Sequence, residues 1–204
     1  MDLNQAIRSY AAQPLTHQLL LSLLKDYKRP NDKLHQLLSK GVLEPVRKGL
    51  YMAGPSIGVN RPEPFLLANH ILGPSYISLD TALSYHGLIP ERVFEIASMT
   101  TKASRSFTTP AGLFTYTHLP LPYYTFGIQQ AQPATDQYVM MASPEKALCD
   151  KIVTTAGIIL RSQASARAYL EEDLRMDEDT LRELNTRMIR AWLPDAPKKD
   201  SLLM

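Results

Sequence analysis

Residues 26–52 read DYKRPNDKLHQLLSKGVLEPVRKGLYM, and the fold of the N-terminal part follows from this stretch. Leu34, Leu37 and Leu38 repeat at intervals of three and four residues, which predicts an amphipathic helix with these leucines on its inner face. The opposite face would be polar and would carry Asp32, Lys33, Gln36, Ser39 and Lys40.

The ends of this helix are also marked in the sequence. Pro30 fits the first helical position, because its ring fixes φ near the helical value, and Asn31 is a candidate N-cap. Gly41 is typical of the residue at which a helix ends.

A tight hairpin is predicted directly after the helix. Residues 42–46 favour a strand, and residues 50–52 favour a returning strand. Arg47, Lys48 and Gly49 would form the turn, in which the glycine supplies the positive φ that such turns need.

A helix with a cationic outer face beside a hairpin with a cationic tip predicts a winged helix-turn-helix. Its helix would enter the major groove of DNA, while the hairpin tip would meet a phosphate or the minor groove. The alternative is that the charged face is simply solvated. The candidate DNA-binding residues are Lys28, Arg29, Lys33, Gln36, Lys40, Arg47 and Lys48.

The charge distribution favours the DNA-binding interpretation. Residues 1–60 hold eight Lys and Arg side chains and four carboxylates, a net charge of +4, whereas the whole chain has only +2. The excess positive charge therefore lies in the same part of the chain as the predicted motif.

Length and composition describe an ordinary globular protein of one large domain or two small ones. The chain has 204 residues, of which 45% are hydrophobic and 21% charged, and no apolar run approaches the ~18 residues of a membrane helix. The first ten residues, MDLNQAIRSY, lack the pattern of a secretory signal, and the single cysteine, Cys149, fits a reducing compartment. We therefore expect a cytoplasmic protein that is not bound to a membrane.

Two further helices are predicted before the central stretch, over residues 3–12 and 16–25, with Thr16 as the N-cap of the second. Glycine and prolines then interrupt the chain at Gly58, Pro62 and Pro64. This break predicts two domains, a winged helix-turn-helix over residues 1–58 and an α+β domain over residues 59–204.

The second domain is predicted to mix helices with a small sheet. Helices are expected over residues 64–72 and 79–86, the second with Ser78 as N-cap and Gly87 as its end. From residue 93 to residue 139 apolar side chains recur with a period of two, which predicts a small antiparallel sheet.

The remainder of the chain is predicted to be helical. Ser143 and Pro144 would begin one helix, and two more are expected over residues 162–174 and 177–193, before a tail at 198–204 that we expect to be disordered. The predicted fold class is thus α+β, with an N-terminal winged helix-turn-helix followed by a mixed domain with a small antiparallel sheet and several helices.

Common catalytic and cofactor motifs are missing from the sequence. It contains no P-loop, G-x-G-x-x-G, H-E-x-x-H, C-x-x-C or G-x-S-x-G pattern. Cys149 lies on an apolar helical face, which favours a structural thiol over a nucleophile, and His86 is expected to be a partly buried structural histidine. We therefore predict no enzyme activity, no catalytic residue, no metal site and no cofactor.

Three stretches together resemble a known family. They are KGVLEPVRKGLYM at residues 40–52, YISLDTALSYHGLIP at 76–90 and ASPEKALCDKI at 142–152. In this order and spacing they resemble the AbiEi-type antitoxins of type IV toxin–antitoxin systems and related transcriptional regulators. The resemblance covers residues 16–152, and Cys149 stands where a leucine is usual in that family.

The resemblance implies a winged helix that binds double-stranded DNA at the protein's own promoter. It also implies a C-terminal domain that opposes a nucleotidyltransferase toxin. Lys33, Gln36, Lys40, Arg47 and Lys48 correspond to the DNA-facing positions of the family. The C-terminal motif is carried by Ser78, Ala82, Leu83, Gly87 and Leu88, which we interpret as cap, packing and helix-stop residues.

Two other hypotheses remain open on the sequence alone. The chain could be a non-enzymatic interaction module whose winged helix docks a protein partner, and Asp32 and Glu44 within the motif favour that alternative. It could also be an unrecognised enzyme that uses His86 or His118.

Overall fold

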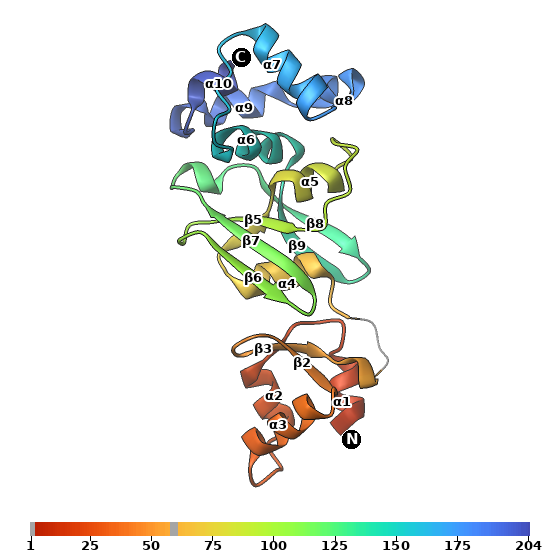
Figure 1. Cartoon of the computed structure of the whole chain (residues 1–204). Helices are drawn as coiled ribbons and strands as arrows, with labels where there is room; N and C mark the ends of the chain where they lie inside the picture. Colours follow the sequence, from red (N-terminus) through yellow and green to blue (C-terminus); the bar gives the residue numbers. More distant parts are fainter. Residues whose placement is uncertain (1–2, 58–60) are drawn as a thin grey trace.

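The computed structural model, which describes residues 3–57 and 61–204, contains two β-sheets with helices packed on each (Figure 1). The N-terminal part runs α1 (Leu3–Ser9), β1 (Leu15–Thr16), α2 (His17–Leu23), α3 (Pro30–Ser39), β2 (Leu43–Arg47), β3 (Leu50–Ala53) and the short 3-10 helix η1 (Pro55–Ile57). Its three strands form an antiparallel sheet in the order β1-β3-β2.

Helix α3 packs as its leucine pattern predicts. Leu34 and Leu37 are buried, and Leu38 is half-buried against the same cluster. The apolar cluster beneath the N-terminal helices consists of Ile7, Leu15, Leu20, Leu24, Leu34, Leu37, Leu43 and Ile57. The inner and outer faces of this helix were therefore predicted correctly.

The predicted ends of α3 are partly confirmed. Gly41 has φ +65°, and the amides of Gly41 and Val42 bond back to the carbonyls of Leu38 and Leu37, which closes the helix with a Schellman motif. The expectation for Asn31 is wrong: Arg29 occupies the N-cap position without a side-chain bond, because Pro30 is the first helical residue.

Two other local predictions in this part are confirmed. Thr16 caps α2, since its hydroxyl accepts from the amide of Leu19 at 3.2 Å. Gly49 adopts φ +82° in the turn between β2 and β3. The hairpin runs slightly later than expected, from Leu43 to Ala53.

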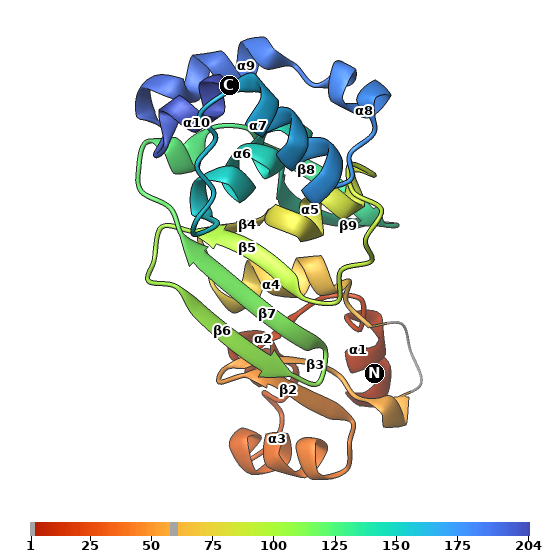
Figure 2. The same ribbon diagram turned by 45° about the horizontal axis from the view of Figure 1, so that its top comes forward.

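The second part of the chain is built on a six-stranded sheet. Its elements are α4 (Pro64–Ile71), β4 (Ser75–Ile77), α5 (Leu79–Tyr85), β5 (Ile96–Thr100), β6 (Arg105–Thr109), β7 (Gly112–His118), η2 (Tyr123–Thr125), β8 (Ile128–Ala134), β9 (Gln137–Ala142) and α6 (Pro144–Thr154). Helix α4 covers one face of the sheet, and α5 with α6 covers the other (Figures 1 and 2).

The prediction of a small antiparallel sheet is wrong in two respects. The strands follow the order β6-β7-β5-β4-β9-β8, and two of the pairs, β5–β7 and β4–β9, are parallel. A period of two reports that one strand face is buried, but it carries no information on the direction of the neighbouring strand. The sheet is therefore mixed, and it includes β4, which precedes the periodic region.

Six short helical segments follow α6 at the C-terminal end of the chain and lie on one side of it (Figure 2). They are α7 (Gln163–Ala168) with the π-helical η3 (Tyr169–Asp173), α8 (Glu178–Glu183), α9 (Thr186–Trp192) with η4 (Leu193–Asp195), and α10 (Lys199–Leu203). The single helix expected over 177–193 is broken, because the side chain of Asn185 caps a new helix. The tail expected to be disordered contains α10.

The hairpin of the N-terminal part also contacts the second part. Val46, Leu50 and Met52 belong to the large apolar cluster, which is formed mainly by side chains of the six-stranded sheet and of the helices that cover it. The boundary predicted at residues 58 and 59 lies outside the described residues and stays a prediction. Within the described residues no helix is long and apolar enough to cross a bilayer.

Because the hairpin shares the large cluster, Leu50→Ala should lower the stability of the whole chain by about 2–5 kcal/mol, the usual cost of truncating a buried leucine. Thermal unfolding followed by circular dichroism should show one transition, shifted to lower temperature. Leu121→Ala, at a side chain that is 65% exposed, is the control and should leave the transition unchanged. Two transitions, of which only one moves, would contradict a shared core.

Candidate functional site

Three of the seven predicted DNA-binding residues lie on the polar face of α3. Gln36 and Lys40 are exposed, and Lys33 is half-buried. These three residues are spaced at i, i+3 and i+7 and so lie on one helical face, whereas Leu34 and Leu37 are buried. Figure 1 shows α3 at the end of the molecule that is farthest from the six-stranded sheet.

Two more candidate residues lie in the turn before α3. Lys28 and Arg29 are both exposed. The guanidinium of Arg29 lies 3.6 Å from the carboxylate of Asp32, but these side chains are 84% and 68% exposed. Such an ion pair in water contributes little, so Arg29 is free to exchange it for another anion.

Lys33 and Gln36 are held to each other. The ammonium of Lys33 donates to Oε1 of Gln36 at 2.9 Å and also lies 5.2 Å from the centre of the Tyr27 ring. The contact orders both side chains on the outer face. It leaves the amide NH2 of Gln36 directed away from the lysine.

Arg47 and Lys48 lie in a different place from the other candidates. The guanidinium of Arg47 donates to the carbonyl of Ile71, at the end of α4, and lies 6.0 Å from the centre of the Phe107 ring. Lys48 lines the crevice at this junction, together with His70 and Lys102. The hairpin tip therefore faces the second part of the chain.

The position of Arg47 could not be read from the sequence. Ile71 and Phe107 follow it by 24 and 60 positions, and no local pattern links them to the hairpin. One signal was present in the hairpin itself: Leu50 and Met52 are apolar and alternate with Tyr51, so they lie on one face of the strand, and both pack into the large cluster.

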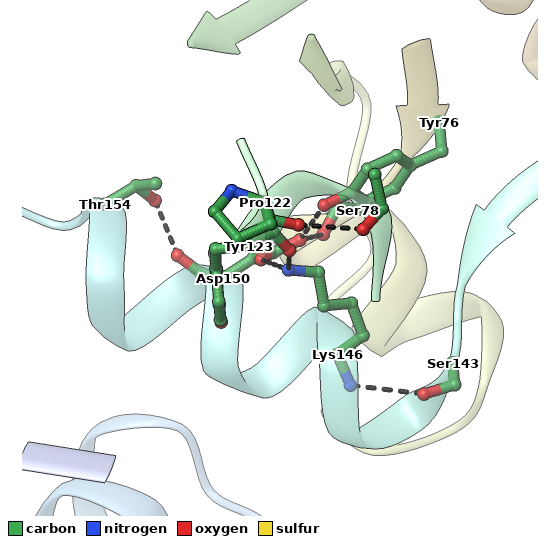
Figure 3. A network of polar contacts seen from close by, with 9 residues as sticks. Tyr76, Ser78, Pro122, Tyr123, Ser143, Lys146, Asp150 and Thr154 are labelled. Carbon is green, nitrogen blue, oxygen red and sulfur yellow. Dashed lines mark hydrogen bonds and ion pairs between the residues drawn. The ribbon is translucent and has the colours of Figure 1, made fainter. Parts of the chain in front are cut away.

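A buried polar network joins the segments of the second part (Figure 3). Lys146 and Asp150 are one turn apart on α6, with Nζ 3.0 Å from Oδ1, and neither side chain has any exposed surface. The other carboxylate oxygen, Oδ2, accepts from the hydroxyls of Tyr76 at 2.9 Å and Ser78 at 2.7 Å.

Lys146 is also bound by η2. Its ammonium donates to the carbonyl of Tyr123 at 2.9 Å and lies 3.4 Å from the centre of that ring. Burial raises the pKa of Asp150 and lowers the pKa of Lys146, and in each case the partner's charge opposes the shift. Because both charged side chains are fully buried, the pair has a structural role in holding α6 in place and is not accessible to a substrate.

Ser78 differs from its predicted role in this network. It does stand at the N-cap position of α5, but its hydroxyl makes no capping bond and donates to Asp150 instead. Neither Lys146 nor Asp150 was singled out from the sequence. They stand four positions apart on α6, but Glu145 and Lys151 flank them in the sequence, so the i, i+4 spacing alone does not distinguish a buried pair from a surface pair.

The residues considered for enzyme chemistry lie apart. His86 Nε2 is 2.8 Å from the carbonyl of Ala142, a structural contact, and His118 is exposed near the carbonyl of Lys102. Among residues 3–57 and 61–204 no group of three His, Cys, Asp or Glu could hold a metal ion. Cys149 is buried as predicted, and burial raises the pKa of its thiol to about 12.

A scan against protein-family models and a search of curated proteins both find no match to this chain. The function is therefore inferred from the site itself and from the resemblance described above.

Removing one member of the buried pair should be costly. Asp150→Ala leaves the Lys146 ammonium unpaired in the core, so we expect a loss of about 3–5 kcal/mol in the free energy of unfolding, measured by urea titration. Asp80→Ala removes a partly exposed ion pair with Lys151 and should cost no more than about 1 kcal/mol. Equal costs for the two variants would refute a special role for the buried pair.

Cys149 should react slowly while the protein is folded. At pH 8 a thiol with a pKa of about 12 is about one ten-thousandth ionised, against about a quarter for a free cysteine. Labelling with a disulfide reagent should therefore be at least about a thousandfold faster in urea than in native buffer. Rapid labelling of the native protein would show that the thiol is accessible.

Proposed function

We propose that this protein is a DNA-binding transcriptional regulator that reads its site with α3, the recognition helix of an N-terminal winged helix-turn-helix. The observation that carries the proposal is the outer face of α3. It presents Lys33, Gln36 and Lys40 on one side, stands at the end of the molecule, and is flanked by the exposed Lys28 and Arg29.

The order of elements supports a winged helix. Helix α1, strand β1, helices α2 and α3 and the hairpin β2–β3 follow one another, and the strands form a sheet in the order β1-β3-β2. In helix-turn-helix proteins the second helix of the pair enters the major groove, while neighbouring elements contact phosphates. Helix α3 has the corresponding position and the cationic surface.

The exposed residues divide into two roles in this proposal. Lys28, Arg29 and Lys40 bind the phosphate backbone and set the position of the helix on the duplex. Gln36 reads an adenine edge, since an amide donor and acceptor pair matches that base in the major groove. Arg47 is left out of the DNA surface, because its guanidinium is bound to the Ile71 carbonyl.

The resemblance to AbiEi-type antitoxins extends the proposal to a partner. The protein would bind its own promoter, and its second part would oppose a nucleotidyltransferase toxin. Two of the motifs that carry the resemblance meet in the buried network, Ser78 from residues 76–90 and Asp150 from residues 142–152. In this protein those motif residues form part of the core of the proposed antitoxin domain.

Salt dependence of DNA binding tests the proposal. Each phosphate contact adds about −0.9 to the slope of log affinity against log salt, so Lys28→Ala with Lys40→Ala should flatten the slope by roughly 2 for every DNA sequence. Gln36→Ala should instead lose about 1–3 kcal/mol on the cognate site alone. The measurement is a fluorescence-anisotropy titration with the upstream DNA and with a scrambled duplex.

A matched variant controls for net charge. Arg161→Ala with Lys199→Ala removes two exposed cations near the C-terminal helices, at the other end of the molecule, and should leave the slope unchanged. If the wild-type chain binds no DNA even at low salt, the regulator proposal fails, and α3 would be a surface for docking a protein.

A further inference from the structure

A hollow lies between α6 and the C-terminal helices that cover it. Its cavity volume is about 320 Å³. It is lined by Leu148, Cys149, Ile152, Leu160, Ala166 and Leu170 at the inner side, and by residues of α8, α9, η4 and α10 nearer the surface. Figure 2 shows these helices surrounding one side of α6.

The inner wall of this hollow is apolar and fixed. Leu148, Cys149 and Ile152 are buried on α6, on the side turned away from Lys146 and Asp150, and Leu160 and Ala166 are buried opposite them. At the packing density of protein interiors, about 0.75, such a volume holds ~240 Å³ of ligand atoms. That is enough for a medium-length acyl chain, and the volume lies within the range of small-molecule sites.

One cation stands among the lining residues. Arg190 is exposed on α9 and has no ion-pair partner among residues 3–57 and 61–204. Thr186, one turn earlier on α9, also lines the hollow, so a guanidinium and a hydroxyl share one edge of it. No Asp or Glu side chain is among the lining residues.

We propose that this hollow binds a small amphipathic acid, with its apolar chain against Leu148, Cys149 and Ile152 and its carboxylate at Arg190. Charge complementarity selects the acid, because the one charged side chain at the edge is a cation and its guanidinium can bind a carboxylate through two parallel hydrogen bonds. The shape of the hollow and its apolar inner wall favour an acyl chain as the other end of the ligand. The site is distinct from the proposed DNA surface on α3.

Calorimetric titration of the full chain with decanoate, with decanol as a neutral probe of equal length, tests this assignment. Saturable binding of decanoate at concentrations below its micelle formation is expected. Arg190→Ala should weaken decanoate about tenfold or more, since it removes hydrogen bonds to a charged group, and should change decanol binding less than twofold. Arg187→Ala is the matched control, at an exposed arginine of α9 outside the lining set, and should change neither.

A variant that fills the hollow tests where the acyl chain of the ligand lies. Ala166→Leu should abolish binding of both probes while the circular dichroism spectrum stays native, and Leu203→Phe at the rim replaces it if Ala166→Leu does not fold. The proposal is overturned if decanoate does not bind, if it binds wild type and Arg190→Ala equally, or if the folded filling variant binds as wild type does. A second copy of the chain covering the hollow, seen as a dimer by light scattering that decanoate does not dissociate, would overturn it as well.

Discussion

The carboxylate of Asp150 holds together segments that are far apart in the sequence. It accepts hydrogen bonds from Tyr76 at the sheet and from Ser78 at the start of α5, and it is paired with Lys146, which in turn binds η2 through the carbonyl of Tyr123. A charge with no exposed surface is stable only while its partners stay in place, because an uncompensated ion in the core costs several kcal/mol. The network therefore fixes the position of α6 against the sheet.

The orientation of α6 has a consequence on its other side. With Lys146 and Asp150 turned toward the sheet, Leu148, Cys149 and Ile152 face the C-terminal helices and form the floor of the hollow there. Both sides of one helix are thus buried, one by polar contacts and the other by apolar ones. This explains why its sequence lacks the simple amphipathic pattern of a helix with one side in water.

A second constraint acts at the junction between the two parts. The last carbonyl groups of a helix lack partners within it and attract cations. Arg47 supplies such a cation to Ile71 at the end of α4, while Val46, Leu50 and Met52 enter the large cluster beside it. The hairpin therefore packs against the second part of the chain, whereas the polar outer face of α3 stays exposed and accessible to a partner.

Local features were determined by the sequence alone. The inner leucines of α3, the cap at Thr16, the positive φ angles at Gly41 and Gly49, the Ser143 cap of α6 and the burial of Cys149 all followed from residue type and spacing. Each depends on a residue's own conformational preference or on neighbours within one or two turns. The outer face of α3, with Lys33, Gln36 and Lys40, was predictable for the same reason.

The tertiary structure decided everything that depends on which distant segments meet. The mixed direction of the strands, the pairing of β4 with β9, the contact of Arg47 with Ile71 and the network around Asp150 involve residues tens of positions apart. Periodicity states only that a side chain is buried, not which partner buries it. The sequence places Lys146 and Asp150 one turn apart on a helix, a spacing that exposed ion pairs also have. The packing of β4, α5 and η2 around them is what buries the pair.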